Sequence, residues 1–353
     1  MIGESLPIEW LSPSRFEDLR QCPLRVAISQ QAPRGAQSHA AFLGELVHDV
    51  YELMVREQTM WLPPEALVPA FDSTWSRVLG KRQSDGTDPT DWADYTRARL
   101  RARRKASVIA EFVRRHEPSA VFPEVVLRSP DGLLGGRSDL IVRADTGTEI
   151  VDYKTGRVGD GANLDKIERQ LRIYAGIEEE VTGILPLRAW ILSTVESWQV
   201  VEIDGTTCRN LLSDARSDLA AFNQRAPGPQ VATPSAEACI HCPHSARCDS
   251  FWDSVQSDWL VTERGTVRHA VSGELLSAEI SGNGTVAIEI AVATSTIPDL
   301  GTAWVTGIEG RSLPIESGLP VGAKVRIVGL RATEGSSERS FRADDGHLKV
   351  HLV

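Results

Sequence analysis

Two aspartates and a lysine form a pattern that could hydrolyse a phosphodiester with the help of a metal ion. Asp139 and Asp152 fall in consecutive predicted strands joined by one tight turn, and apolar residues flank both. An acidic residue in such a strand is costly to bury unless it is paired or metal-bound, and two carboxylates can converge on one divalent cation. Lys154 shares a strand face with Asp152 and would contact the attacking water or the phosphate. The alternative is an edge strand with a surface ion pair between Asp152 and Lys154.

Cysteines form a second chemical pattern. Three of them have the spacing C-x2-C-x5-C: Cys239, Cys242 and Cys248. Three thiolates this close can enclose one metal centre, and Cys22 is the candidate for the fourth ligand. Cys208 falls in a predicted amphipathic helix and is expected to be a buried thiol. Since His241 and His244 could supply nitrogen ligands, the spacing alone leaves zinc and an iron–sulphur cluster open.

The elements that must position these residues alternate between strands and helices. Short segments separated by tight turns favour an antiparallel meander, with strands over 121–127, 133–142 and 148–153. Two further strands are expected over 187–195 and 198–203. Apolar residues at helical spacing predict helices over 9–30, 40–60, 63–80, 91–116, 164–180 and 208–224. We expect an α/β domain over residues 1–255, with a helical insertion at about 40–118.

The composition changes after residue 259, where short alternating segments follow one another between turns. Strands are expected over 267–269, 277–280, 285–293, 301–308, 323–330, 340–343 and 348–352. They predict a small all-β domain over 260–353, either a barrel or a sandwich. Basic and aromatic residues of this domain could form a groove for single strands: Trp304, Arg326, Arg331, Phe341, Arg342, His347 and Lys349. The alternative is an accessory barrel that packs on another part of the chain or on a partner.

Composition and charge limit the possible functions. The chain has 353 residues, 41% of them hydrophobic and 24% charged, which is typical of a globular protein with two domains. The net charge of -10 excludes a general basic coat but leaves room for a local basic groove. The cations of residues 97–105 are either a phosphate-tracking patch or a solvated helix face. Because there is no long apolar run and no secretory signal, we expect a cytoplasmic protein without a membrane partner, whose cysteines bind metal or stay free.

Several motifs together resemble the PD-(D/E)XK nuclease superfamily, specifically its RecB-like branch. They are Gly136 to Asp139, Val151 to Gly156, the pair Gln170 and Tyr174 on one helix face, and Gly44 to His48 upstream. The nominal proline of the superfamily is replaced by Gly-Arg-Ser before Asp139. The resemblance implies a restriction-endonuclease-like α/β fold and a Mg2+ or Mn2+ cofactor.

The resemblance also assigns roles to individual residues. The metal ligands would be His48, Asp139, Asp152 and the carbonyl of Tyr153. Lys154 would be catalytic together with the two aspartates. Gln170 and Tyr174 would bind DNA and steady the site. Glu124, on the strand before Asp139, is a possible additional acidic member; the alternative is an exposed strand residue.

The placement of the cysteines resembles that of AddB-type nucleases and of the iron–sulphur exonucleases of CRISPR adaptation. In these proteins one cysteine lies far upstream and three follow the glutamine–tyrosine helix. The resemblance implies a 4Fe-4S cluster on Cys22, Cys239, Cys242 and Cys248. The strands near the C-terminus look like the closing strands of an OB-fold.

The sequence therefore predicts a deoxyribonuclease, an exonuclease more than an endonuclease, that acts on single-stranded DNA or DNA ends. Repair, recombination and defence are the expected settings. A helicase or another repair protein is a possible partner, and no Walker A motif makes this chain itself a helicase. Two alternatives stand beside this prediction. One is a catalytically silent module that binds DNA ends or a helicase, and the other is a zinc-stabilised RNA-processing nuclease.

Overall fold

Two compact units make up the part of the chain that the computed structural model describes. The described residues are 4–31, 39–83, 88–92, 94–159, 161–261, 265–280, 285–309, 320–333, 340–343 and 348–353. The α/β unit comprises Leu6–Glu17 and Ala32–Pro227, and the barrel unit comprises Met1–Ser5, Asp18–Gln31 and Gly228–Val353. The boundary passes through helix α1 (Pro13–Gln21). The domain limits predicted from the sequence, 1–255 and 260–353, stay a prediction.

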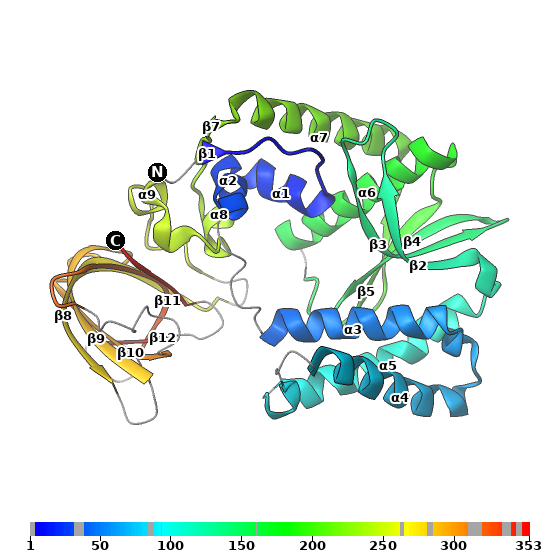
Figure 1. Ribbon diagram of the computed structural model, residues 1–353, viewed down its shortest axis with the longest axis horizontal. Coiled ribbons are helices and arrows are strands. Elements are labelled where there is room, and N and C mark those ends of the chain that lie inside the picture. Colours follow the sequence, from blue (N-terminus) through cyan, green and yellow to red (C-terminus); the bar gives the residue numbers. More distant parts are fainter. Residues whose placement is uncertain are drawn as a thin grey trace. The chain divides into compact units, whose positions relative to one another are not determined.

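A five-stranded mixed sheet with the order β2-β3-β4-β5-β6 forms the centre of the α/β unit (Figure 1). Its strands are β2 (Val121–Arg128), β3 (Gly135–Ala144), β4 (Gly147–Lys154), β5 (Arg188–Ser193) and β6 (Gln199–Glu202). The first three form the predicted antiparallel meander, which is thus confirmed. β5 runs parallel to β4, because helix α6 (Ala162–Thr182) crosses over between them.

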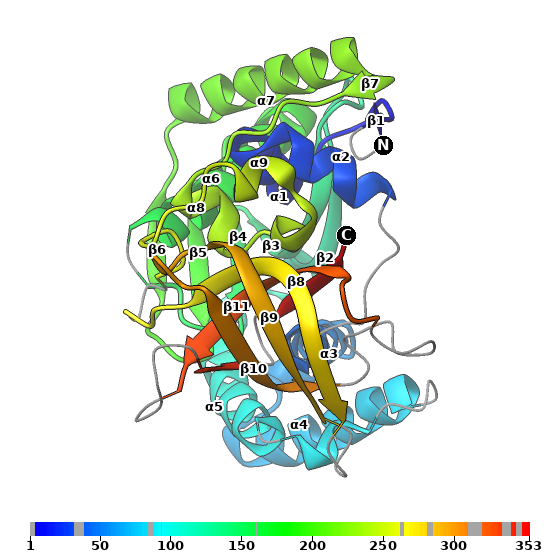
Figure 2. The same cartoon turned by 90° about the vertical axis from the view of Figure 1, so that its left-hand side faces the viewer.

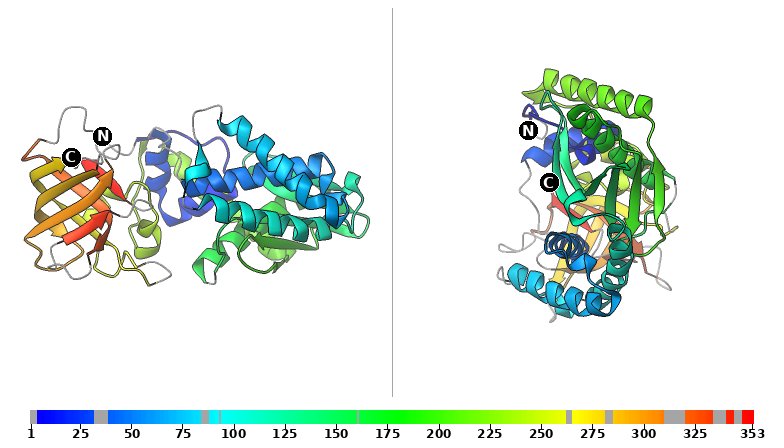
Figure 3. Two further views of the ribbon diagram at one scale, coloured as in Figure 1. Left: turned by 90° about the horizontal axis from the view of Figure 1, so that it is seen from below. Right: turned by 90° about the vertical axis from the view of Figure 1, so that its right-hand side faces the viewer.

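Helices cover both faces of this sheet, as the views in Figures 1 and 3 agree. One face carries α3 (His39–Arg56), α4 (Pro64–Gln83) and α5 (Tyr95–Val113), whose apolar stripes share one core with the sheet. The other face carries α6 and α7 (Gly205–Arg225). Single turns of 3-10 helix lie at η1 (Thr59–Trp61), η2 (Pro89–Asp91) and η3 (Pro118–Ala120). The part of the sheet that carries the candidate carboxylates is therefore packed between helices on both faces.

Buried ion pairs fix α6 in its place. Glu178 is fully buried and accepts two hydrogen bonds from Arg143 of β3, at 2.6 and 2.9 Å. Glu17, also buried, accepts two from Arg169, both at 2.8 Å. A Cβ on Gly176 would lie 2.9 Å from Leu212 Cδ1 of α7, so a larger residue there would require the leucine side chain to move. Buried paired charges of this kind constrain geometry strongly, because breaking a pair would leave a buried charge uncompensated.

Four of the six cations of α5, all of them described residues, pair within the chain. Arg97 forms an ion pair with Asp94, and both Arg99 and Arg103 reach Asp72. Lys105 donates a hydrogen bond to the carbonyl of Glu196. These contacts favour the solvated, internally paired helix face over a phosphate-tracking patch.

The barrel unit contains a sheet that closes on itself (Figure 2). Its strands are β8 (His269–Ile280), β9 (Thr285–Ser295), β10 (Thr302–Glu309), β11 (Lys324–Ala332), β12 (Ser340–Ala343) and β13 (Lys349–Leu352). β8, β9 and β10 form an antiparallel meander, and β11 pairs with β8. β12 closes the ring, because it pairs antiparallel with β11 and parallel with β10.

One strand replaces two that the sequence predicted. The single strand β8 begins at His269, the last residue of the segment expected over 267–269, continues through Gly273 and contains the whole segment expected over 277–280. A Cβ at Gly273 would lie 1.9 Å from the carbonyl oxygen of Ala291, so the neighbouring backbone comes too close for any other residue. A register shift beside Gly273 marks the same place as a bulge. The residues between the two expected segments are therefore part of one strand, and glycine at position 273 allows the neighbouring backbone to approach.

The segments around Cys22, Cys239, Cys242 and Cys248 belong to the barrel unit. They comprise α2 (Pro23–Gln31), α8 (Ala236–Ile240), η4 (Ser245–Arg247) and α9 (Asp249–Trp252), with the short pair β1 (Glu4–Ser5) and β7 (Gly228–Pro229). The single helix expected over 9–30 is two helices, since Pro23 has no amide hydrogen and starts the second one. Within the described residues, no helix is long and apolar enough to cross a membrane.

Candidate metal centre and cysteine pocket

The sheet register brings three carboxylates into a row across β2, β3 and β4. Pro123 pairs with Leu140 and Val125 with Ser138, so Glu124 lies directly opposite Asp139. In the ladder between β3 and β4, Leu140 pairs with Val151. The same register, continued by one residue, puts Asp152 of β4 opposite Asp139, on the side of β3 away from β2. Residues directly opposite on neighbouring strands have adjacent side chains. We refer to Glu124, Asp139 and Asp152 as the carboxylate row.

The backbone hydrogen bonds between β3 and β4 end at this row, and the next backbone amide of β4 bonds to a side chain of β3. Asp139 Oδ2 accepts a hydrogen bond of 2.6 Å from the backbone amide of Tyr153. The amide and carbonyl of one strand residue point to the same side, so the Tyr153 carbonyl is directed toward Asp139 as well. The Tyr153 ring is buried and packs edge-on against Tyr51 and His48 of α3.

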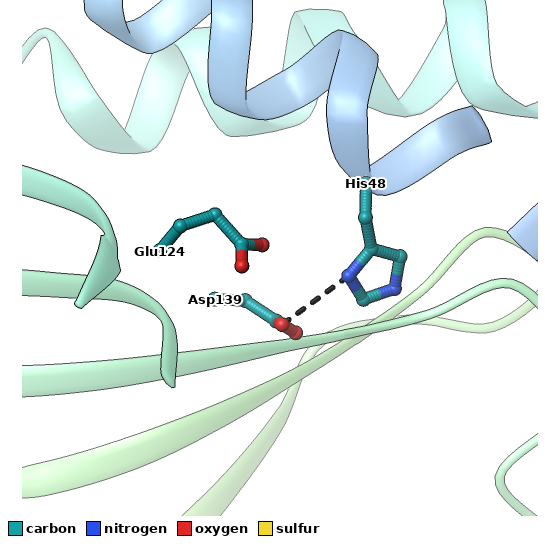
Figure 4. Close-up of side chains that lie close together, drawn as sticks. All are labelled: His48, Glu124 and Asp139. Carbon is teal, nitrogen blue, oxygen red and sulfur yellow. Dashed lines mark ion pairs between the residues drawn. The ribbon is translucent and has the colours of Figure 1, made fainter. Parts of the chain in front are cut away.

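His48 approaches the carboxylate row from α3. Its Nδ1 lies 3.2 Å from Asp139 Oδ1, the contact drawn in Figure 4. One ligand atom each from His48, Glu124 and Asp139 lies within 4.8 Å of the other two, so these residues could hold one metal ion. Gly44, one turn earlier, faces Thr155 at the end of β4, where a Cβ would be 3.4 Å from the hydroxyl oxygen. Because Gly44 and His48 are one turn apart on α3, the helix contacts both the end of β4 and the carboxylate row.

The electrostatics show an excess of buried negative charge. Burial and the charge of Asp139 raise the pKa of Glu124 to about 7. Burial raises the pKa of Asp152, and Lys154 only partly opposes this. Burial lowers the pKa of His48, but Asp139 and the other carboxylates outweigh it and raise that pKa to about 9. Oxygen-rich anionic sites of this kind suit a divalent cation, so the residues present fit Mg2+ or Mn2+.

Glu124 also has a strained backbone. Its φ is 51°, in the left-handed region that residues other than glycine rarely adopt. Such strain persists only where the surroundings enforce it, and it is concentrated at functional sites. The sequence left open whether Glu124 was an exposed strand residue; its side chain is in fact only 12% exposed.

Lys154 is oriented by the carboxylate row. Its Nζ lies 2.8 Å from Asp152 Oδ2, which confirms the predicted proximity of the two side chains. Burial lowers the pKa of Lys154, but Asp152 and Asp139 outweigh it and raise the pKa above its usual value. Lys154 therefore stays protonated and presents an ammonium group beside the carboxylates.

The structure separates the two residues of the glutamine–tyrosine pair. The Tyr174 hydroxyl donates a hydrogen bond of 2.9 Å to the carbonyl of Arg137, and a Cβ on Gly136 would lie 2.9 Å from the same hydroxyl. Tyr174 thus supports β3 just before Asp139. Gln170, one turn earlier on α6, lines an open pocket together with Lys154.

One acidic residue of the site escaped the sequence reasoning. Glu52 lies one helical turn after His48 on α3, and its charge contributes to the raised pKa of Glu124. It forms an ion pair with Arg56 at 2.8 Å. The spacing of four residues after His48 was the signal that could have identified it.

Four of the five cysteines line one small, largely apolar pocket in the barrel unit: Cys22, Cys239, Cys242 and Cys248. All are free thiols. The fifth, Cys208, is buried in α7 and packs near Gly176 of α6. The structure therefore brings together the four cysteines that the sequence grouped and leaves Cys208 apart, as expected.

The surroundings of this cysteine pocket suit an anionic group. Arg25 lines the pocket, and Lys349 of β13 donates a hydrogen bond of 3.3 Å to Ser245 Oγ beside it. Burial lowers the pKa of Lys349 to about 8. Burial also lowers the pKa of His244 to about 4, and its ring bonds Ser29 Oγ at 2.8 Å. The neutral His244 is thus held by Ser29, while the cations face the thiols.

One comparison with known proteins, the scan against family models, identifies a family. The model of the PD-(D/E)XK nuclease superfamily matches residues 10–249, more than half of the chain. No curated protein matches. Among solved structures 28 chains match, and one of them, the crystal structure of SSO0001, is 14% identical over 59% of this chain and 98% of that chain. Its TM-score is 0.28, so this likeness carries no argument.

Proposed function

Because the chain belongs to the PD-(D/E)XK nuclease superfamily, we propose that it is a Mg2+- or Mn2+-dependent deoxyribonuclease of the RecB-like branch. The observation that carries this proposal is the carboxylate row with Lys154 and His48 around it. A chain that only bound DNA would gain nothing from three adjacent buried carboxylates, since each costs free energy to bury.

Each residue of the site has a role in this proposal. His48, Asp139, Asp152 and the Tyr153 carbonyl would hold the metal ion, with Glu124 as a further acidic ligand. The ion, when bound, polarises the scissile phosphate and lowers the pKa of the attacking water. The Lys154 ammonium would orient that water and stabilise negative charge on the phosphate oxygens. Asp152 keeps Lys154 in place through their 2.8 Å contact.

DNA is the proposed substrate, as single strands or duplex ends, and exonucleolytic cleavage is the proposed mode. Gln170 is placed to contact the strand, since it lines the open pocket that begins at Lys154. Tyr174 would act mainly by supporting β3 through its bond to Arg137. Repair, recombination or defence would be the setting, with a helicase or another repair protein as partner.

We also propose a 4Fe-4S cluster on Cys22, Cys239, Cys242 and Cys248. Ligands of tetrahedral zinc at 2.3 Å require sulphur–sulphur distances of about 3.8 Å. No three of the cysteine sulphurs, all of them in described segments, lie within 4.8 Å of one another. The wider spacing and the neighbouring cations favour a larger anionic cluster over a single zinc ion. The cluster would tie residue 22 to the loop 239–248.

For the barrel we propose an OB-like module that contacts single-stranded DNA. A five-stranded ring with a meander, a returning strand and a parallel closing pair is the arrangement of partly open Greek-key barrels that bind oligonucleotides. Arg331 and Arg342 lie directly opposite each other on β11 and β12, and Trp304 is 41% exposed on β10 beside β12. Adjacent arginines with an exposed aromatic ring suit a stacked strand and its phosphates.

Other residues expected in that groove have different surroundings. Phe341 is fully buried in the barrel core. Arg326 pairs with Asp249 at 2.7 Å, and Lys349 faces the cysteine pocket. His347 lies outside the described residues. The groove is therefore smaller than the sequence suggested.

Digestion of end-labelled DNA tests the proposed function. We expect linear single-stranded DNA to be degraded with Mg2+ or Mn2+, and Asp152→Asn to lower the rate by about 10³-fold or more, since the variant cannot hold the ion or Lys154. The matched control is Asp94→Asn, an exposed aspartate on the surface of the α/β unit, which should leave the rate unchanged. Undiminished digestion by a pure Asp152→Asn preparation would refute the site. No digestion by the unaltered protein on any DNA would favour the silent end-binding module.

A further inference from the structure

An open pocket with a volume of about 300 Å³ begins at Lys154 and extends away from the carboxylate row. Its wall is formed by the loop after β4 and the first two turns of α6. None of His48, Glu124 and Asp139 lines it. The pocket thus shares Lys154 with the candidate active site but lies outside the group formed by His48, Glu124 and Asp139.

The pocket is cationic. Arg157 and Lys166 line it together with Lys154, and no carboxylate is among the described lining residues. Within the described part of the chain, neither Arg157 nor Lys166 forms an ion pair, although most arginines of the α/β unit do. Cations that are gathered in a pocket and not neutralised by the protein raise the local concentration of anions.

The loop that carries Arg157 is held in place by the end of β5. Ser193 Oγ donates a hydrogen bond of 2.8 Å to the carbonyl of Gly156, and Thr194 Oγ1 donates one of 2.7 Å to that of Thr155. Glu196 Oε2 accepts one of 2.8 Å from the amide of Val158. A loop fixed on both sides of Arg157 loses little entropy when a ligand binds, so its contribution to affinity is larger.

Helix α6 supplies the opposite wall. Asn163, Lys166 and Gln170 follow each other at spacings of three and four residues, so they share one face of the helix. Asn163 Nδ2 donates a hydrogen bond of 2.6 Å to the carbonyl of Val158, which links this face to the loop. The helix has 21 residues and begins at Ala162, so its positive dipole end adds to the charge of the two side chains.

We propose that this pocket binds the terminal phosphate of a DNA strand, so that the enzyme prefers phosphorylated ends. The inference rests on the proposed nuclease function. A terminal phosphomonoester carries up to two negative charges and exposes three oxygens, whereas an internal phosphodiester carries one charge and continues on both sides. Two unpaired cations and amide donors in a pocket beside the cleavage centre match the terminal group better. Arg157 would provide a forked contact and Lys166 a point charge.

The test measures binding separately from cleavage. Short single strands labelled at one end carry either a phosphate or a hydroxyl at the other end, and anisotropy is recorded with Ca2+ in place of Mg2+. We expect the unaltered protein to bind the phosphorylated strand, of one or the other polarity, about tenfold more tightly. Arg157→Gln and Lys166→Gln should each remove most of this preference and change the affinity for hydroxyl ends by less than about threefold.

Arg115→Gln is the matched control, since it removes an exposed arginine of the same unit that does not line the pocket. It should retain the preference. Equal weakening of both strands by Arg157→Gln would mean an internal phosphate contact, and no preference in the unaltered protein would mean no terminal site; either result overturns the inference. Digestion without end preference would refute the terminal-phosphate pocket but not the nuclease function. End preference without any digestion would refute the nuclease function but not the pocket.

Discussion

The carboxylate row and the cysteine pocket are both candidate metal sites, but they are assembled in different ways. The row comes from three neighbouring strands within residues 121–154, plus one helix, and its geometry follows from sheet register. The cysteine pocket comes from residue 22 and a loop more than 200 residues later. Register can place charges next to each other even when they repel, because backbone hydrogen bonds hold the strands. Among the described residues, the segments of the cysteine pocket are joined by the short β1–β7 pair and by single hydrogen bonds such as that from the Leu24 amide to the Val231 carbonyl, 3.2 Å long, and no long ladder crosses the pocket.

This difference implies different responses to loss of the bound group. The negative charge of the row stays partly balanced without a metal ion, since Lys154 and His48 contact its aspartates directly. The cysteine pocket is apolar, and burial raises the pKa of Cys239 to about 11 and also raises the pKa of Cys242 and of Cys248, so these three thiols are neutral when nothing is bound. A ligand that requires thiolates must then supply most of the free energy that joins the distant segments. We expect the row to tolerate removal of its metal and the cysteine pocket to depend on its cofactor.

The largest expected effect is on the cysteine pocket. Cys242→Ser should abolish the visible absorbance of the cluster and lower the free energy of unfolding by about 3 kcal/mol, or the melting temperature by about 10 °C. Iron analysis, absorbance and thermal unfolding measure these changes. Cys208→Ser is the matched control: it alters a buried thiol outside the pocket and should keep the iron. Full iron content in Cys242→Ser, or equal loss in both variants, would contradict the assignment.

A smaller, opposite effect is expected in the carboxylate row. The raised pKa of Glu124, about 7 against 4.5 in the unfolded chain, means that the folded state retains this proton longer. Stability of the metal-free protein should therefore fall as the pH rises through this window. Glu124→Gln should remove that loss and stabilise the metal-free protein by about 1–2 kcal/mol at about pH 8, but not at about pH 4. Thermal unfolding with a chelator at both pH values measures this.

The same variant should lose function while it gains stability. Without one anionic ligand, the Mg2+ concentration needed for half-maximal cleavage should rise about tenfold. If Glu124→Gln were less stable at high pH and unchanged in its Mg2+ requirement, the row would not be a metal site that includes Glu124.

The smallest expected effect distinguishes a tyrosine that positions the carboxylate row from one that only stabilises the fold. Tyr174→Phe and Tyr51→Phe each remove one hydroxyl that bonds a backbone carbonyl at 2.9 Å, that of Arg137 or that of Ala102. Each should cost about 1 kcal/mol of stability. Only Tyr174→Phe should also slow cleavage, by about threefold to tenfold, because Arg137 lies two residues before Asp139. Equal cleavage rates for the two variants would remove Tyr174 from the positioning of β3.

Local patterns predicted most elements of the α/β unit because each is a short segment with a clear period. The meander, α3 and α6 have this form. The predictions that differed involve residues whose meaning depends on a distant neighbour. Gly273 fell between two predicted strands but lies inside one strand, against the backbone of Ala291, and Lys349 looked like a groove residue but contacts Ser245. Nothing within a window of ten or twenty residues reveals such contacts.

The sequence alone determined which chemical groups this protein has and their order: two strand aspartates, a lysine two residues on, a helical histidine, and one distant cysteine with three clustered ones. Residue type and period carry that information because they act locally. Only the tertiary structure decided that Glu124 lies opposite Asp139 with a strained backbone, and that Arg157 and Lys166 share a pocket. Those facts depend on register and on helix placement, which the packing of segments far apart in the chain determines.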